Sequence, residues 1–247
     1  MNVVLLGATR GMGRAVARRL AERGDAVCLL GRDRAVLEAS ARDLQVRAGL
    51  PEPLPVAYCD LERPDSFASA LDAAAGALGR IDAVVVTAGH FSTEDDLAAS
   101  EPDAARLLAT VNFANTVGFC EAARRRLLAD GGGSLCVFSS VAGDRGRTPV
   151  VTYGATKAGL TAYLEGLDHR YARDGLRVIC VKPGFVRTGM TAGLKPPPFA
   201  GNPDPVARRV VRAIDRGVPV VYAPAVWRWI MLVVRWLPRA IMRRVRF

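Results

Sequence analysis

The sequence predicts a single doubly wound α/β domain with a seven-stranded parallel sheet and an extra amphipathic helix at the C-terminus. Short apolar segments alternate with longer segments of helical periodicity along residues 1–224. The apolar segments are continuous rather than alternating, as expected of strands that are buried on both faces of a sheet. No internal repeat or change of composition divides residues 1–224, so we expect one domain there, with residues 225–247 as a separate basic helix.

Seven apolar segments are assigned as strands, and turn-forming residues such as glycine, proline and aspartate follow most of them. In chain order they span residues 2–7, 26–30, 56–59, 81–87, 134–139, 176–181 and 218–222. Helical patterns fill the intervals between strands. The first helix is expected from the glycine-rich turn to Arg23, and the next two over 34–47 and 65–78. A long helix is expected after residue 103 up to about residue 128, a central helix after Pro149, and a last one over 206–215. Loops are expected at 93–96 and 189–203.

The chain of 247 residues carries a formal net charge of +10, which favours anionic partners. We expect no nucleic acid partner, because no nucleic-acid-binding motif accompanies the arginines. The five cysteines are widely spaced and form no Cys-x-x-Cys pattern. They predict buried thiols in a reducing compartment rather than disulfides, and we expect no metal site. The N-terminus enters a strand without a signal-peptide pattern, which indicates a cytoplasmic protein.

A serine, a tyrosine and a lysine form a candidate catalytic group. Tyr153 follows Ser140 by thirteen residues, and Lys157 follows Tyr153 by four. On a helix, Tyr153 and Lys157 lie one turn apart on the same face. The ammonium group of Lys157 is expected to lower the pKa of Tyr153 from about 10, which would make the tyrosine an acid or base near neutral pH. Ser140, at the end of a strand, is placed to hold a substrate oxygen.

The turn between the first strand and the first helix has the pattern Gly7-x-x-x-Gly11-x-Gly13. Gly7 would allow a tight turn, Gly11 would let the backbone approach a pyrophosphate at the helix N-terminus, and Gly13 would allow close helix–strand packing. The alternative is an ordinary glycine turn. The residues expected to bind a dinucleotide here are Gly7, Thr9, Arg10, Gly11, Met12 and Gly13.

The end of the second strand indicates which dinucleotide binds. An acidic residue there usually binds the ribose 2′-hydroxyl of NAD, whereas Arg32 suits the 2′-phosphate of NADP(H), and Arg10 adds a second cation. The alternative is that Arg32 is a solvated loop residue. Asp60 and Leu61, after the third strand, are expected beside the adenine ring, although a turn aspartate explains Asp60 nearly as well. Ala88 and Gly89 would let the cofactor approach the fourth strand.

In this order and spacing, the motifs resemble the short-chain dehydrogenase/reductase family, whose members are Rossmann-type oxidoreductases. The resemblance covers residues 2 to about 222 and rests on Gly7-x-x-x-Gly-Met-Gly13, Ala88-Gly89, Ser140, Tyr153-x-x-x-Lys157 and Pro183-Gly184. One departure is Thr87, where the family often has asparagine. The resemblance implies homodimers or homotetramers.

The resemblance also implies roles for individual residues. Tyr153 would donate a proton to a ketone, Ser140 would bind the reacting oxygen, and Lys157 would contact the nicotinamide ribose and lower the tyrosine pKa. Asn112 matches the asparagine that supports a proton-relay water. The residues that would line the nicotinamide side are Pro183, Gly184, Val186 and Thr188.

The second half of the chain is similar to a narrower subgroup, the decaprenylphosphoryl-erythro-pentofuranos-2-ulose reductases. The segments that carry this similarity are 139–147, 181–191 and 222–232. The similarity implies reduction of a keto sugar on a polyprenyl phosphate. Arg187 departs from the acidic residue that relatives often carry and is expected to alter what the site accepts. Two alternatives remain: a reductase of soluble ketones, alcohols or 3-keto lipids such as ketosphinganine, and a non-catalytic NADPH-binding scaffold at a membrane.

Residues 225–247 contain three tryptophans and no acidic residue. At helical spacing, the arginines 228, 235, 239, 243 and 246 share one face, and Ile230, Val233, Val234, Leu237 and Ile241 share the opposite face. Pro238 should kink or split the helix. Two placements remain open. The helix lies on an anionic membrane surface, which would make the protein peripheral on the inner face of the membrane, or it docks on its own sheet or on a second subunit, and the two placements are not exclusive.

Overall fold

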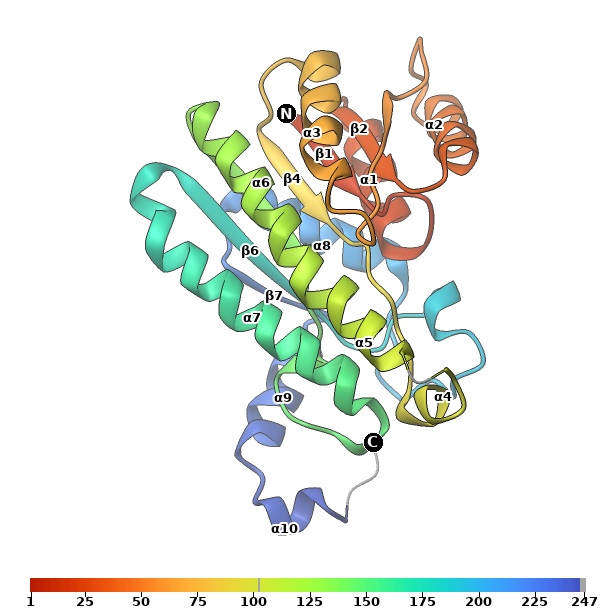
Figure 1. The fold of residues 1–247 in the computed structure, drawn as a ribbon, viewed down its shortest axis with the longest axis vertical. Coiled ribbons are helices and arrows are strands. Elements are labelled where there is room, and N and C mark those ends of the chain that lie inside the picture. The colour runs from red at the N-terminus through yellow and green to blue at the C-terminus, as the bar shows by residue number, and fades with distance from the viewer. Residues whose placement is uncertain (102, 245–247) are drawn as a thin grey trace.

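The computed structural model describes residues 1–101 and 103–244, and its seven strands form one parallel sheet (Figure 1). The strands are β1 (Asn2–Leu6), β2 (Ala26–Gly31), β3 (Val56–Tyr58), β4 (Ala83–Val86), β5 (Gly133–Phe138), β6 (Leu176–Pro183) and β7 (Val220–Ala223). Their order is β3-β2-β1-β4-β5-β6-β7, so the chain changes direction across the sheet between β1 and β4. The predicted fold class is confirmed, and a crevice is expected at this switch point, beyond the carboxyl ends of the strands.

Helices cover both faces of the sheet. One face packs against α1 (Gly11–Glu22), α2 (Arg34–Ala48) and α8 (Pro203–Arg216), and the other against α3 (Ser66–Leu78), α6 (Thr116–Ala129) and α7 (Val151–Tyr171). Val3 and Leu5 point into the first core and Val4 and Leu6 into the second, because successive side chains of a strand point to opposite faces. Two covered faces explain why the strands are continuously apolar.

The helix expected to end near residue 128 has an irregular centre. It consists of α5 (Ala104–Ala109), the π-helical segment η1 (Thr110–Asn115) and then α6. A π-helical turn within an α-helix is rare and often occurs at a functional site. Here it contains Asn112, one of the predicted site residues, whose side chain is fully buried.

Several segments differ from the sequence prediction. The expected acidic loop at 93–96 begins a short helix, α4 (Glu94–Ala98), because Thr93 and Asp96 form a capping box and three acidic residues occupy its first turn. Helix α8 begins at Pro203 rather than at 206, since proline is well suited to the first helical turn. Four short 3₁₀ segments complete the list: η2 (Val141–Gly143), η3 (Thr148–Val150), η4 (Ala172–Asp174) and η5 (Gly189–Thr191).

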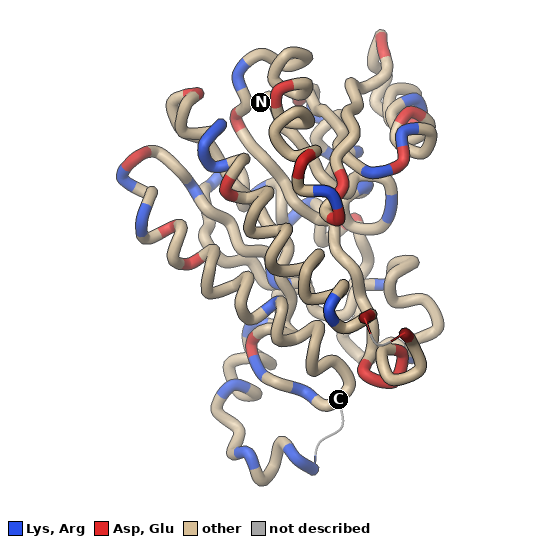
Figure 2. Tube along the Cα trace, viewed as in Figure 1, with Lys and Arg blue, Asp and Glu red and all other residues tan. Residues whose placement is uncertain are grey.

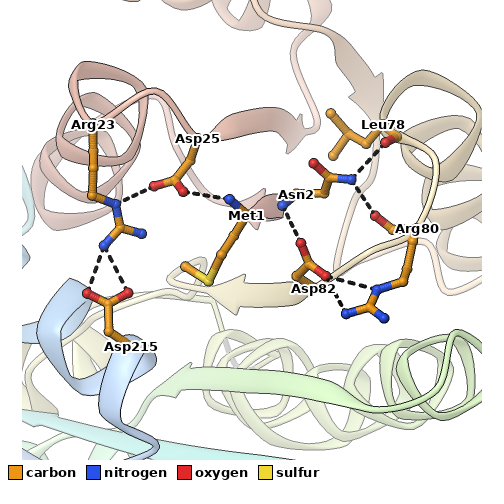
Figure 3. A network of polar contacts seen from close by, with 8 residues as sticks. All are labelled: Met1, Asn2, Arg23, Asp25, Leu78, Arg80, Asp82 and Asp215. Atoms are coloured by element: carbon orange, nitrogen blue, oxygen red, sulfur yellow. Dashed lines mark hydrogen bonds and ion pairs between the residues drawn. The ribbon is translucent and has the colours of Figure 1, made fainter.

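A network of charged groups ties together the amino-terminal edge of the sheet (Figure 3). The Met1 amine lies 2.8 Å from Asp25, and Arg23 connects Asp25 to Asp215 of α8. Beside it, the backbone N–H of Asn2 donates to Asp82 at 2.8 Å. Polar contacts therefore hold this edge closed, and the crevice described below lies at the opposite edge.

The C-terminal segment forms two helices, α9 (Val226–Trp236) and α10 (Arg239–Met242), which are separated at Pro238 as predicted. Helix α9 packs on its own domain through Trp227, Met231 and Val234, in a cluster with Val141. The prediction that Val233 and Val234 share one apolar face is wrong, because Val234 is buried whereas Val233 is 63% exposed. Arg246, predicted on the basic face, lies outside the described residues.

The outer side of α9 carries a second set of large apolar side chains. Trp229 is 65% exposed and Trp236 82%, with Leu232 and Val233 also exposed between them. The charged residues of α9 and α10 that the structure describes are all arginines (Figure 2). The helix therefore has one buried apolar side and one exposed side that is both apolar and cationic.

Candidate active site

The glycine turn joins β1 to α1 at the switch point of the sheet. Gly7 has a φ of +96°, which side chains with a Cβ rarely adopt, and a Cβ at this position would lie 2.6 Å from the backbone nitrogen of Ala88. A Cβ on Gly13 would overlap the carbonyl oxygen of Gly7. Only glycine fits at these two positions, and the close packing predicted for Gly13 is confirmed.

Thr87 holds this turn against the end of β4. Its hydroxyl lies 3.1 Å from the carbonyl oxygen of Leu6 and 3.0 Å from that of Gly7, and it donates to them. The sequence marks Thr87 only as a departure from the family pattern. Its side chain bonds the backbone of the neighbouring strand, a role that depends on the pairing of β1 with β4.

A first cavity of about 390 Å³, which we call the nucleotide cleft, lies beyond the ends of β1, β2 and β3. The predicted cofactor residues that line it are Gly7, Thr9, Arg10, Arg32, Asp60, Leu61, Ala88 and Gly89. Lining residues outside that prediction include Asp33, Val36, Cys59, His90 and Val111. Cations and carboxylates therefore both occur in the cleft, and their hydrogen bonds decide which of them faces a ligand.

Asp33 is the acidic residue closest to the end of β2, and it is already engaged. Its carboxylate accepts a hydrogen bond from the backbone N–H of Val36 at 3.0 Å and so caps α2. Arg32, in contrast, is 62% exposed and makes a surface contact of 3.2 Å with Glu62. Such an exposed ion pair is weak and easily exchanged for a ligand.

Ser140, Tyr153 and Lys157 come together where β5 meets α7. Lys157 is buried, and its ammonium donates to the carbonyl oxygen of Phe138 at 2.9 Å. The Nζ atom of Lys157 lies 5.7 Å from the centre of the Tyr153 ring. The edge of Phe91 packs on the same ring, with 5.0 Å between the two ring centres. These contacts hold the phenol between a cation and an aromatic side chain.

The proton affinities differ from the sequence prediction. Burial raises the pKa of Tyr153 to about 12, although a hydrogen bond with Ser140 and the charge of Arg147 act in the opposite direction. Burial also lowers the pKa of Lys157 from 10.5 to about 8. The pKa of Tyr153 was expected to fall and is instead raised, because desolvation of the phenolate outweighs the Ser140 hydrogen bond and the charge of Arg147.

Close backbone packing fixes the serine relative to the tyrosine. The segment η2, which follows Ser140, lies so near α7 that a Cβ on Gly143 would come within 2.6 Å of the Lys157 backbone. Ser139 adds a buried hydrogen bond of 2.9 Å from its hydroxyl to the carbonyl oxygen of Lys157. The geometry of the three-residue group is therefore set by the contact between β5, η2 and α7.

Asn112 lies on the other side of the group, beneath the turn after β4. Its Oδ1 accepts from the backbone N–H of His90, and its Nδ2 donates to the His90 carbonyl oxygen, both at 2.7 Å. The side chain therefore holds the Gly89–His90 backbone in place. The predicted support of a relay water stays a prediction.

A second cavity of about 340 Å³, which we call the substrate pocket, opens beside Tyr153. The predicted site residues that line it are Met12, Ser140, Tyr153, Pro183, Gly184, Val186 and Thr188. Gly11 adjoins this group, since a Cβ on it would lie 3.3 Å from the Thr188 methyl. The predicted residues are therefore divided between two cavities that meet at the glycine turn, with Lys157 and Asn112 behind them.

Sequence analysis missed Phe91, Val141 and Arg147 in the wall of the substrate pocket. The loop at 189–202 and the tail, which the sequence predicts to shape a substrate cleft, contribute Met190, Lys195 and Trp227 to this wall. Arg187, which was expected to alter what the site accepts, does not line this pocket and donates to the Ala200 carbonyl oxygen at 3.0 Å. A signal for Arg147 was available, since it lies between Ser140 and Tyr153 in the sequence.

The loop between η2 and η3 is anchored to distant parts of the chain. Lys182 lies 2.6 Å from Asp144, and the two side chains are 5% and 1% exposed. The Tyr222 hydroxyl donates to the same carboxylate at 2.8 Å. The next residue, Arg145, donates to the carbonyl oxygen of Leu237 at the end of α9 at 2.8 Å. The loop between η2 and η3 therefore links the segment that carries Ser140 to β6, β7 and the tail.

Other site classes find no support in the described residues. Within residues 1–101 and 103–244, no three His, Cys, Asp or Glu side chains are grouped as a metal site would need. The five cysteines are buried and free, and burial raises the pKa of Cys28 to about 12. No helix in this described part of the chain has the length and apolar character needed to cross a bilayer.

Comparison with known proteins gives a consistent result. The family model described as short chain dehydrogenase matches residues 1–198. Carbonyl reductase family member 4 of Xenopus tropicalis is 29% identical over 219 residues, which cover 85% of this chain and 89% of that protein. An uncharacterized oxidoreductase of Mycobacterium tuberculosis is 33% identical over 246 residues, or 98% of this chain and 96% of that protein.

Solved structures show the same fold. A short-chain dehydrogenase/reductase from Mycobacterium ulcerans superposes with a TM-score of 0.81 at 23% identity, covering 89% of this chain and 86% of that one. The actinorhodin polyketide ketoreductase with NADPH superposes with a TM-score of 0.79 at 22% identity, covering 89% and 94%.

Proposed function

The chain belongs to the short-chain dehydrogenase family of oxidoreductases that act on carbonyl or alcohol groups, and we propose that it reduces a ketone to a secondary alcohol with NADPH. The observation that carries the proposal is that two cavities adjoin at the glycine turn, one of them lined by Ser140 and Tyr153. One has the glycine turn and the arginines that a dinucleotide needs, and the other is a mostly apolar pocket that reaches the phenol. NADPH would supply the hydride to the carbonyl carbon when it is bound.

The chain's own residues would handle the proton and the oxygen. Tyr153 gives its phenolic proton to the oxygen of the ketone, and Ser140 holds that oxygen by a hydrogen bond. A phenol whose pKa is raised to about 12 stays protonated at neutral pH, so the free enzyme is prepared for the reductive direction. Lys157 is held by Phe138 below the phenol, where it would contact the nicotinamide ribose. Asn112 keeps the adjoining turn in place and would support a relay water.

The preference for NADP(H) over NAD(H) rests on charge. Arg10 and Arg32 both line the nucleotide cleft, and the carboxylate of Asp33 is committed to the N-terminus of α2. A guanidinium group binds a phosphate with two parallel hydrogen bonds, so these arginines suit a ribose 2′-phosphate. Asp60 and Leu61 would lie beside the adenine ring, and Pro183, Gly184, Val186 and Thr188 beside the nicotinamide.

For the substrate, we propose an amphiphilic or lipid-linked ketone, such as a keto sugar on a polyprenyl phosphate. The apolar wall of the substrate pocket and the tail helix that forms part of it support this class. Soluble ketones and 3-keto lipids are the second candidate, since the pocket volume of about 340 Å³ also suits them. A non-catalytic scaffold is the third, and the intact Ser140, Tyr153 and Lys157 group argues against it.

NADPH oxidation with a panel of ketones tests the proposal. The panel should contain lipid-linked, 3-keto acyl and small soluble ketones at matched concentrations. We expect turnover with at least one ketone and the highest kcat/KM with an amphiphilic one. Tight NADPH binding without turnover of any ketone in the panel would favour the scaffold.

We further propose that the protein is a cytoplasmic homodimer or homotetramer that associates with the inner face of the membrane. The exposed side of α9 combines tryptophans with arginines, as helices at an anionic lipid surface do. Flotation with vesicles that contain phosphatidylglycerol should recover the protein, and the double variant Trp229→Ser, Trp236→Ser should stay in the lower fractions. Leu107→Ser, which changes an exposed apolar residue outside the tail, is the control. Failure of the wild-type protein to float would contradict membrane association, and equal flotation of all three proteins would contradict the role of α9.

A further inference from the structure

The substrate pocket contains cationic side chains that reduction of a ketone does not itself require. Arg147 comes from the loop before α7 and Lys195 from the loop that follows η5, and both line a wall that is otherwise largely apolar. No aspartate or glutamate is among the described residues that line the pocket. Burial lowers the pKa of Arg147, which means that the protein holds this charge at a cost in solvation.

Arg147 is held in place by an anchored loop. Asp144 lies three residues earlier, and its carboxylate is bound by Lys182 at 2.6 Å and by the Tyr222 hydroxyl at 2.8 Å. Arg145 bonds the end of α9. The two anchors fix the loop on both sides of the pocket wall, so the position of Arg147 in this wall is determined by the fold.

Trp227 gives an independent sign of a polar ligand in the same pocket. Its side chain is 7% exposed, and its Nε1 is buried without a hydrogen-bond partner among the described residues. The indole packs so tightly on Gly184 that any Cβ there would overlap it. A rigidly held, unsatisfied N–H donor is costly to bury, and a ligand oxygen in the pocket would satisfy it.

We propose that Arg147 and the Trp227 N–H, with Lys195 at the rim, form a subsite for an anionic group that the ketone substrate carries. A phosphate monoester or diester or a carboxylate has oxygens that these donors can bind, and a guanidinium binds either with two parallel hydrogen bonds. The carbonyl would lie at Ser140 and Tyr153, and the apolar part of the substrate against Val141 and Phe91. This inference rests on the proposed ketone reduction and defines its substrate more narrowly.

Paired substrates test the subsite. Each pair consists of a keto alcohol and its phosphate monoester, so that only the anionic group differs. Arg147→Met should lower the ratio of kcat/KM between phosphate and alcohol about 30-fold, as expected for the loss of hydrogen bonds to a charged group. Arg147→Lys should lower this ratio about fivefold, because lysine keeps the charge without the planar guanidinium group. Trp227→Phe, which keeps the ring and removes the N–H, should lower the ratio about fivefold. Arg173→Met, on exposed η4, is the matched control and should leave the ratio unchanged.

If Arg147 acted only on the proton transfer at Tyr153, its variants would give a different pattern of kinetic constants. The charge of Arg147 also acts on Tyr153, so a variant that only altered the tyrosine would lower kcat for both members of a pair equally. That result, or a wild-type enzyme that does not distinguish the phosphate from the alcohol, would overturn the proposed subsite.

A binding measurement separates this inference from the proposed function. Calorimetry with decyl phosphate and decanol needs no turnover and can use the Tyr153→Phe variant. Tighter binding of decyl phosphate that Arg147→Met abolishes supports the subsite even if no ketone is reduced. Equal binding of the two ligands overturns the subsite even if ketones are reduced. Methyl phosphate then identifies the source of the anion, since an affinity close to that of decyl phosphate indicates a small soluble substrate and a much weaker one indicates an amphiphile.

Discussion

The nucleotide cleft and the substrate pocket meet at the glycine turn, yet they are built in different ways. The cleft is formed by residues between Leu6 and Val111, which follow consecutive strands of the sheet. The pocket combines residues from Met12 to Trp227, drawn from helices α1 and α7, from the loops that follow β4, β5 and β6, and from the tail helix. The first cavity follows the ends of neighbouring strands, and the second depends on how distant loops and the tail pack together.

This difference explains why the cofactor class follows from short motifs and the substrate does not. A pyrophosphate needs a turn and a helix N-terminus, which glycines at fixed spacing specify locally. The pocket depends on where the Asp144 loop, the segment around Lys195 and α9 pack against one another. Experiments that separate the two cavities and the residues between them sharpen the comparison, and five predictions follow from the largest expected effect to the smallest.

The largest effect is expected at Tyr153, in the wall of the substrate pocket. Tyr153→Phe removes the proposed proton donor and keeps the ring that packs against Phe91. We expect kcat to fall by about 10²–10⁴-fold, the usual contribution of a general acid. The affinity for NADPH, measured by fluorescence titration, should change less than twofold. Unchanged turnover would refute the proposed chemistry.

Lys182→Met should lower the free energy of unfolding and so loosen the loop that forms part of the substrate pocket. It leaves the Asp144 carboxylate buried without its ion partner, and such a loss costs about 3–5 kcal/mol. We expect a lower urea midpoint and a higher KM for the ketone, with a smaller change in the Kd for NADPH. Arg34→Met removes an exposed pair with Glu38 and should cost less than about 0.5 kcal/mol. A similar loss in both variants would show that the buried pair is not an anchor.

Arg32→Ala should affect only the nucleotide cleft. If Arg32 binds the 2′-phosphate, its removal should lower the preference for NADPH over NADH about 10–100-fold, the value of hydrogen bonds to a charged group. The ratio of kcat/KM for the two coenzymes measures this. Arg34→Ala changes an arginine two residues away that does not line the cleft, and should leave the ratio within twofold. A preference for NADH in the wild type would contradict the assignment of NADP(H).

The dependence of kcat/KM on pH should show the deprotonation of Lys157. Its pKa of about 8 in the fold lies within the working range, whereas Tyr153 stays protonated up to about 12. If the ammonium positions the cofactor ribose, kcat/KM for reduction should be constant at low pH and fall up to tenfold per pH unit above about 8. A flat profile up to pH 10 would contradict this role.

The same shift predicts how stability depends on pH. The unfolded chain binds a proton at Lys157 up to about pH 10.5, and the folded chain only up to about 8. The contribution of Lys157 to stability therefore rises as the pH increases through this window. The neutral variant Lys157→Met should remove that rise in urea denaturation curves measured from pH 7 to 10.

The sequence by itself determined the sheet, the glycine turn and the Ser140, Tyr153 and Lys157 group. Continuous apolar strands require two covered faces, and Gly7 and Gly13 stand where the backbone leaves no space for a side chain. These requirements are local or periodic, so they are visible in one dimension. The break of the tail helix at Pro238 is local in the same sense, because proline cannot continue a helix.

Only the tertiary structure decided the surroundings of these residues. Lys157 was expected to lower the pKa of Tyr153, but burial of the phenol reverses the direction. Val233 and Val234 were expected on one apolar face of the tail, but Val234 packs on the domain with Trp227 and Met231 while Val233 is exposed. Arg147 lies in the pocket wall because Asp144 reaches Lys182 and Tyr222, which lie 38 and 78 residues further along the chain. Desolvation and long-range packing depend on which distant segments meet, and no pattern of neighbouring residues records that.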